Sequence, residues 1–138
     1  MKHLRALIFA APLALSLFAN GPVKWEHDYQ SALKRARAEK KLIFMDLWTE
    51  WCPPCQYLQK NVFPSAEGQA ALAKVVPFSA LVEKKDRTPL PEGTKLAEQF
   101  QLNAFPTMVV LDAQGKELRR QVGLFRTGAE FAAWLNAK

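Results

Sequence analysis

The sequence has few of the residues that build metal sites and disulfide frameworks. Its 138 residues include two cysteines and two histidines, His3 and His27. A mononuclear structural zinc site usually takes about four Cys or His ligands, so two cysteines are too few for one. They are also too few for the dense disulfide framework of a small secreted miniprotein. The cysteine pair is therefore a structural disulfide, a redox couple or two unrelated thiols, and its spacing has to decide.

Low-complexity segments and internal repeats are absent as well. The chain is 49% hydrophobic and 23% charged, which is the composition of an ordinary globular protein and excludes a disordered or collagen-like chain. At ~100–200 residues per domain, the length fits one domain with its own core. The formal net charge of +6 includes a basic cluster at 34–41, whose helical spacing is typical of a solvated helix face. A nucleic-acid partner is therefore not expected.

The sequence contains no long membrane-spanning run, although it begins with an apolar segment. Lys2 and Arg5 precede the almost wholly apolar run Ala6–Ala19, which is shorter than the ~20 residues that a bilayer-spanning helix needs. A basic start, a short apolar segment and small residues at its end are typical of a secretory signal peptide. We therefore expect residues 1–19 to be a signal peptide and residues 20–138 to be the exported domain. An uncleaved N-terminal anchor is the alternative.

The hydrophobic pattern predicts alternating helices and strands. The continuous apolar run at 42–48 is typical of a strand that is covered on both faces, and caps, turn residues and periodicity indicate the other elements. In chain order, we expect a helix at 28–40, a strand at 42–48, a helix from Cys52 to before Pro64 and a helix at 65–74. A strand at 75–82, a long loop at 83–93 and a helix at 94–100 follow. The chain then forms a hairpin of strands at 107–112 and 116–122 and a last helix, which a capping box at 127–130 opens. This order predicts a single three-layer α/β sandwich.

The two cysteines, Cys52 and Cys55, lie where the apolar strand gives way to a helix. Residues three apart lie on the same side of a helix, so the two sulfurs can close a small disulfide ring. Backbone N–H groups and positive potential at the helix start favour the Cys52 thiolate, which is the attacking species in exchange. Cys55, one turn further along, is expected to be more buried and to act as the resolving thiol. The spacing therefore favours a redox couple.

Other roles for the pair have less support in the sequence. A structural disulfide is the main alternative, although so short a loop constrains the unfolded chain little and adds little stability. Haem attachment would need a histidine directly after the second cysteine, where Gln56 stands. A copper site would need a histidine close to the pair in the sequence. We therefore expect no metal and no organic cofactor.

The segment Phe44–Cys55 resembles the active-site strand and turn of the thioredoxin family. Phe105-Pro106-Thr107, which leads into an apolar strand, is similar to the family's cis-proline loop, and the similarity covers about 25–138. Trp25 before an Ala-rich helix and Asn61–Pro64 after the active-site helix resemble the C-terminal periplasmic domain of the transmembrane reductase DsbD and its exported relatives. The resemblance implies a thioredoxin-like three-layer α/β/α sandwich with a central mixed β-sheet.

The resemblance also implies roles for individual residues. Cys52 would be the nucleophile and Cys55 the resolving thiol. Asp46 matches the family's buried aspartate, which takes up or delivers the proton of the resolving thiol, and Pro106 matches the cis-proline that packs against the disulfide. The lysine with which the family's aspartate usually pairs has no counterpart in the strand at 75–82.

Three more residues, Trp51, Pro53 and Phe105, are candidates for substrate binding. Trp51 beside a thiol supplies an apolar docking surface, and Phe105 is bulkier than the family's usual residue, which would narrow what docks. The backbone before Pro106 can pair with an extended substrate segment as an added strand. Two plainer alternatives stand beside these roles: Asp46 could face solvent at a strand end, and Pro106 could simply start a strand.

Together, the residues and the resemblance predict a thiol–disulfide oxidoreductase that reduces disulfides of exported proteins in the periplasm. The resemblance implies a membrane electron donor of DsbD or CcdA type as a partner, and we expect a monomer. The direction of exchange depends on the reduction potential, and the reduction potentials of related proteins span ~150 mV. A thioredoxin-fold binding module or chaperone with a redox-idle cysteine pair is the alternative from another class.

Overall fold

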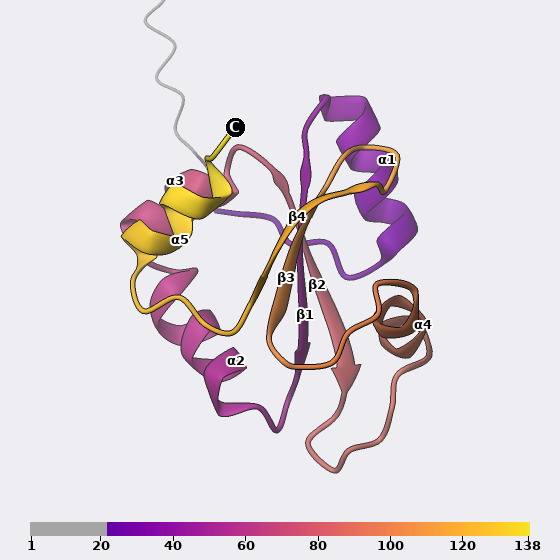
Figure 1. The fold of residues 1–138 in the computed structure, drawn as a ribbon. Coiled ribbons are helices and arrows are strands. Elements are labelled where there is room, and N and C mark those ends of the chain that lie inside the picture. Colours follow the sequence, from indigo (N-terminus) through magenta and orange to yellow (C-terminus); the bar gives the residue numbers. More distant parts are fainter. Residues whose placement is uncertain (1–21) are drawn as a thin grey trace, which may run out of the picture.

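The computed structural model describes residues 22–138 (Figure 1), so the predicted signal peptide lies outside the described residues. Among residues 22–138, none of the helices combines the length and the apolar character that crossing a bilayer requires. The elements are, in chain order, α1 (Tyr29–Glu39), β1 (Ile43–Thr49), α2 (Pro53–Tyr57), the π-helical turn η1 (Leu58–Val62), α3 (Ala66–Leu72), β2 (Val76–Glu83), α4 (Pro91–Gln99), β3 (Thr107–Leu111), β4 (Glu117–Val122) and α5 (Gly128–Leu135).

The strands form one mixed sheet in the order β2-β1-β3-β4. Strand β1 pairs in parallel with β2 and antiparallel with β3, and β3 pairs antiparallel with β4. All positions of β1 except Trp48 are buried, because the strand is central and helices cover both of its faces. This double burial explains why its sequence is a continuous apolar run rather than an alternating one.

Helices cover both faces of the sheet, with α1 and α4 on one side and α2, η1, α3 and α5 on the other (Figure 1). An aromatic cluster fills the second side: the ring of Phe44 contacts those of Trp25, Phe63 and Phe131 at centroid distances between 5.2 and 6.0 Å. The architecture confirms the predicted three-layer α/β/α sandwich with a central mixed sheet.

Three of the predicted helices begin at a residue whose side chain caps the first turn. Asp28, Ser65 and Thr127 each accept a hydrogen bond from the backbone N–H three residues further along, at 2.7, 3.0 and 3.1 Å. Each bond satisfies a donor that the first helical turn leaves without a partner. The predicted capping box differs in one bond, because the Glu130 carboxylate accepts from the Arg126 N–H at 2.9 Å rather than from that of Thr127.

Helix α4 begins earlier than the sequence pattern predicts. It starts at Pro91 rather than at Thr94, so the loop after β2 covers only 84–90 instead of the expected 83–93. Proline suits the first helical position because its missing N–H would have no partner there. The expected loop was therefore wrong at Pro91, which opens the helix, and right at Pro89, which lies in the loop.

The predicted single helix after Cys52 is divided into α2 and η1. In η1 the Phe63 N–H donates to the Leu58 carbonyl, five residues back, at 2.9 Å. A π-helical turn adds a residue to the repeat and so changes which face the following side chains present. The helix ends before Pro64, as predicted, because proline has no N–H with which to continue the ladder.

The segment before α1 adds a short piece to the outer edge of β2, which the sequence pattern did not indicate. Glu26 forms an isolated parallel bridge there. Its N–H donates to the Pro77 carbonyl at 2.8 Å, and its carbonyl accepts from the Ser79 N–H at 2.9 Å. These bonds hold the neighbouring residues Trp25 and His27 beside the sheet.

Candidate active site

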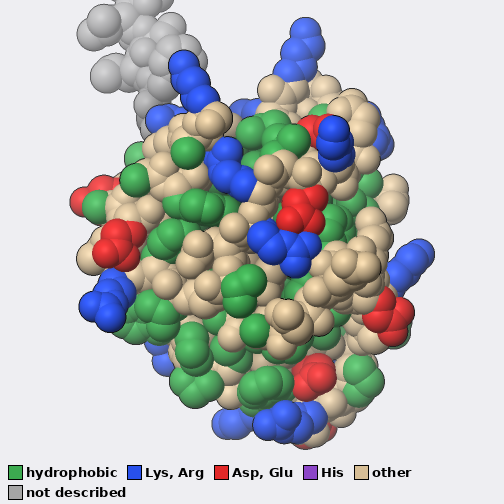
Figure 2. Space-filling model, viewed as in Figure 1, with side chains coloured by type: hydrophobic (Ala, Val, Ile, Leu, Met, Phe, Trp, Pro, Cys, Tyr) green, Lys and Arg blue, Asp and Glu red, His purple; other side chains and the backbone are tan. Residues whose placement is uncertain are grey.

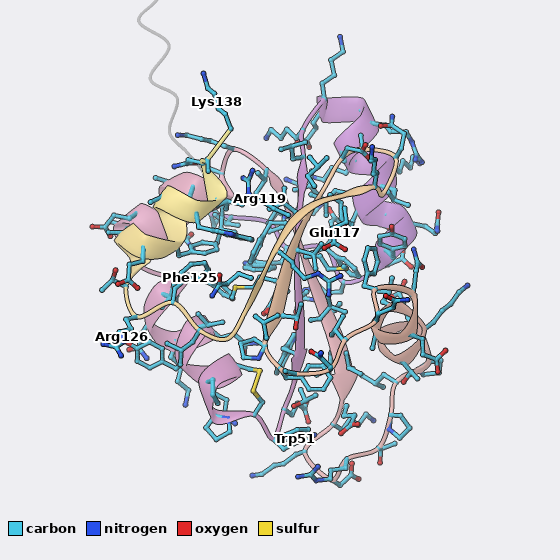
Figure 3. All side chains as sticks on the ribbon, viewed as in Figure 1. Trp51, Glu117, Arg119, Phe125, Arg126 and Lys138 are labelled. Atoms are coloured by element: carbon cyan, nitrogen blue, oxygen red, sulfur yellow. A yellow bond between two sulfur atoms is a disulfide. The ribbon has the colours of Figure 1, made fainter. Side chains whose placement is uncertain are left out.

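The two cysteines are joined in a disulfide at the start of α2, with their Cα atoms 5.3 Å apart. Pro53 and Pro54 open the helix and Cys52 is its N-cap residue, whose sulfur accepts a hydrogen bond from the Cys55 N–H at 3.3 Å. Figure 3 shows the disulfide at the start of α2, close to Trp51. Cys52 is 3% exposed and Cys55 is fully buried. The predicted order of burial is confirmed, and only Cys52 offers any surface to a partner.

The loop before β3 contacts Trp51, the residue before Cys52, through its aromatic residue. The Phe105–Pro106 peptide bond is cis, as the resemblance implied, and Pro106 is buried. The Pro106 carbonyl accepts from the Gly123 N–H at 3.0 Å, which ties the loop to the end of β4. Phe105 meets the ring of Trp51 edge to face, with centroids 6.1 Å apart. The packing of Pro106 on the disulfide itself stays a prediction.

Trp51 is held by three contacts from distant parts of the chain. Its Nε1–H donates to the Glu83 carboxylate at 2.7 Å, and the Arg87 guanidinium lies 4.2 Å from the centre of its ring. Phe105 makes the third contact. A cation over a tryptophan face and a charge-assisted hydrogen bond both favour a fixed ring. The sequence pattern did not indicate Glu83 and Arg87, because only the tertiary fold brings the end of β2 to this place.

Asp46 lies in the middle of β1 and is 1% exposed, so the alternative of a solvent-facing aspartate is wrong. Its neighbours in register are Ser79 on β2 and Met108 on β3, both uncharged. Burial raises the pKa of the Asp46 carboxyl to about 7, and a hydrogen bond with Gln59 offsets part of the rise. Its Oδ1 atom has no hydrogen-bond partner. A carboxyl with such a pKa can take up and release a proton near neutral pH.

A pocket of about 330 Å³, which we call the side pocket, lies next to Asp46 between η1, β2 and the segment before α1. Two residues that line the pocket are joined by a hydrogen bond, in which the Trp48 Nε1–H donates to the Ser79 Oγ at 2.8 Å. The sequence pattern did not indicate the pocket, although Gln59, four residues after Cys55, could have been placed on the sheet-facing side of the helix. The lining residues are Trp25, His27, Asp46, Trp48, Gln59, Phe63, Pro64, Gln69 and Ser79.

Across residues 22–138, no three or more His, Cys, Asp and Glu side chains are grouped so that they could hold a metal ion. The chemical groups that the site holds are the buried Asp46 carboxyl and the Cys52–Cys55 pair.

A cysteine pair at the start of a helix after the central strand of a mixed sheet, with a cis-proline before the next strand of that sheet, is typical of a thioredoxin-fold domain. Residues 29–138 match the family model described as a thioredoxin-like domain. The chain belongs to this family. The predicted resemblance is thereby confirmed over nearly all of the described residues.

The known proteins that are similar to this chain include disulfide-exchange proteins. The thiol:disulfide interchange protein DsbD of Pseudoalteromonas atlantica is 32% identical over 114 residues, which are 80% of this chain and 18% of that protein. The chain thus spans less than a fifth of the length of this curated relative. The solution structure of a thioredoxin from Thermus thermophilus is 30% identical, with a TM-score of 0.68 over 83% of this chain and 85% of that one. The oxidised C-terminal domain of DsbD from Neisseria meningitidis, 19% identical, shares the fold with a TM-score of 0.61 over 80% and 96% of the two chains.

Proposed function

We propose that this protein is a periplasmic thiol–disulfide oxidoreductase that reduces the disulfides of exported proteins. The observation that carries this proposal is the Cys52–Cys55 disulfide at the start of α2, in a chain of the thioredoxin-like family. A dithiol that closes reversibly to a disulfide can supply two electrons to a partner. The name thiol:disulfide interchange protein, carried by the DsbD relatives, supports the same class of reaction.

The exchange runs in two steps that together move two electrons. The Cys52 thiolate attacks one sulfur of the partner disulfide, and the other partner sulfur leaves as a thiolate that takes a proton from water. The Cys55 thiolate then attacks the Cys52 sulfur of this mixed disulfide and closes the Cys52–Cys55 disulfide. The second partner sulfur leaves as a thiolate, which takes a proton from water as the partner departs. The partner is reduced to its dithiol and the protein is oxidised. Run backwards, the same steps oxidise a partner.

Cys55 has to lose a proton before it attacks, and Asp46 is the group that we assign to take it. With a pKa of about 7, the Asp46 carboxyl is present in both protonation states near neutral pH. Gln59 lies in η1, which follows directly on the helix that holds Cys55, and it lines the side pocket together with Asp46. This arrangement supports a short proton path from the resolving thiol to the carboxyl.

The partner docks on the surface around Cys52 in this proposal. Trp51 and Phe105 are in edge-to-face contact and Pro53 is exposed, so Cys52, the only exposed part of the dithiol, has an apolar residue on each side of it in the chain. The backbone before Pro106 can pair with an extended partner segment as an added strand. A docking surface this small suits partners that bind briefly and leave after exchange.

The direction, the partners and the compartment are supported by the DsbD relatives and by the first residues of the chain. The signal-like segment 1–19 supports export to the periplasm, where proteins form disulfides. Disulfide-containing exported proteins would receive the electrons, and a membrane donor of DsbD or CcdA type would return them. The protein would act as a monomer.

Reduction of insulin in the presence of dithiothreitol tests the proposed activity. We expect the protein to catalyse precipitation of the insulin B chain and the Cys52→Ser variant to have no effect. Absence of turnover by the wild-type protein would instead favour a thioredoxin-fold binding module or chaperone with a redox-idle cysteine pair. Equilibration with glutathione buffers then gives the reduction potential, and a strongly oxidising value would contradict the reducing direction.

A further inference from the structure

The buried carboxyl of Asp46 has an opening of its own, apart from the dithiol. It lines the side pocket, and none of the proposed docking residues Trp51, Pro53 and Phe105 lines that pocket. Asp46 is 1% exposed and its Oδ1 atom has no hydrogen-bond partner among the described residues. Because buried polar atoms are nearly always paired with protein or water, this oxygen calls for a water in the pocket.

The side pocket has the size and the lining of a site for water. At ~30 Å³ for each water molecule, a volume of about 330 Å³ holds several. Among the residues that line it, Asp46 and His27 are the only titratable ones, and no lysine or arginine faces the carboxyl there. His27 and Pro64 are exposed, so they form the rim through which the pocket meets solvent.

In the proposed reaction, a partner bound at Cys52 covers the dithiol side of the site. Cys52 is only 3% exposed and Cys55 is fully buried even without a partner, so a mixed disulfide at Cys52 leaves little room for water there. Yet the resolving step gives Asp46 a proton while the partner is still attached. That proton has to reach solvent before the next cycle, and a covered dithiol offers no path for it.

We propose that the side pocket is the proton exit of the exchange reaction, an inference that rests on the proposed function. Cys55–SH and the Asp46 carboxylate become a thiolate and a carboxylic acid. The acid then returns its proton to water in the pocket, and the proton leaves between His27 and Pro64 while the partner still covers Cys52. Electrons and protons thus leave the site by different sides of the molecule.

Ser79 is placed to orient the water next to the carboxyl. Its Oγ accepts from the Trp48 Nε1–H at 2.8 Å, which leaves its own O–H free to donate. It also lies directly opposite Asp46 in the register of β1 and β2. A hydroxyl at this place keeps the pocket open and polar, where a longer side chain would fill it.

Two substitutions at the rim of the pocket test the route. His27→Trp and Pro64→Trp each place a large ring at the mouth of the pocket. Because the two residues lie in different segments of the chain, the test can be made even if only one of the two variants folds. Lys24→Trp, on the same segment as His27 but outside the pocket, is the matched control. Each prereduced protein is mixed with insulin, or with oxidised glutathione, a small disulfide that leaves the dithiol side open to water. Thermal unfolding reports which variants are folded.

We expect the two rim variants to reduce insulin roughly tenfold more slowly, with a larger solvent deuterium isotope effect, because proton transfer becomes limiting. Glutathione reduction, and both reactions of Lys24→Trp, should proceed at wild-type rates. Wild-type rates with insulin in a folded rim variant would overturn the proton exit, and so would equal slowing with both disulfides. If the wild-type protein itself fails to reduce insulin, the proposed function is refuted and the proton exit falls with it.

An infrared measurement follows the same proton without turnover. A mixed disulfide is made chemically between Cys52 of the Cys55→Ser variant and a cysteine-containing protein, and it is then mixed into heavy water. The Asp46 carboxylic acid band is expected to shift within the mixing time when the pocket is open, and many times more slowly with His27→Trp added. Equally fast deuteration in the two proteins would contradict an exit through the pocket.

Discussion

Asp46 is the residue whose burial serves the proposed chemistry and lowers the stability of the fold when its carboxyl is ionised. It is 1% exposed, and its register neighbours Ser79 and Met108 carry no charge. Burial raises the pKa of Asp46 from 3.8 to about 7, so the folded state binds the proton more strongly than the unfolded state does. The free energy of unfolding therefore falls as the pH rises through the range between these two values.

Replacing the carboxyl with an amide should remove this pH dependence. We expect the free energy of unfolding of Asp46→Asn, relative to that of wild type, to increase by roughly 2 to 4 kcal/mol as the pH is raised from below about 4 to above about 7. The gain vanishes below about pH 4, where the wild-type carboxyl is protonated in both states. Urea unfolding of the two proteins across this range measures the difference. A difference that is independent of pH, or that grows as the pH falls, would contradict the raised pKa.

At the scale of elements, the end of β2 and the loop after it brace the residues before the cysteine pair. Glu83 accepts from the Trp51 indole N–H, and Arg87 lies over its ring. The Glu50 carboxylate accepts from the Lys85 N–H at 2.8 Å, which fastens the loop at another point. The loop thus sets the position of one wall of the proposed docking surface.

Loosening this brace should weaken docking without changing the thiol chemistry. We expect Glu83→Ala to raise the KM for insulin about threefold to tenfold, because Trp51 loses a charge-assisted hydrogen bond. The rate with oxidised glutathione should stay the same. Glu98→Ala, an exposed glutamate of α4, is the matched control. An unchanged KM in a variant whose Trp51 fluorescence has shifted would remove Trp51 from the docking surface.

The elements differ in how far the sequence could predict them. Strand β1 and the cysteine-bearing turn have local signals, a continuous apolar run and the Pro53–Pro54 pair at a helix start. The π-helical turn η1 has no pattern that separates it from an ordinary helix. The side pocket depends on which residue of β2 lies opposite Asp46, and the bond from Trp51 to Glu83 joins positions 32 apart. Both follow only from tertiary register.

At the scale of the whole molecule, the face shown in Figure 2 carries no single stripe of positive charge. Basic, acidic and hydrophobic side chains are interspersed on the face shown in Figure 2. In the basic cluster at 34–41, Arg35 pairs with Glu26 at 3.1 Å and with Glu39 at 2.9 Å, and Lys41 pairs with Glu39 at 3.2 Å. These ion pairs agree with the solvated helix face that the spacing predicts.

Covalent trapping tests most directly the central claim that Cys52 attacks the partner and Cys55 resolves the complex. The full chain carrying Cys55→Ser is expressed in a Gram-negative bacterium, beside the chain carrying Cys52→Ser. The Cys55→Ser protein should accumulate a mixed disulfide with an exported protein, which dithiothreitol releases and mass spectrometry identifies. The Cys52→Ser protein should trap nothing. Trapping by both variants, or by neither, would contradict the account.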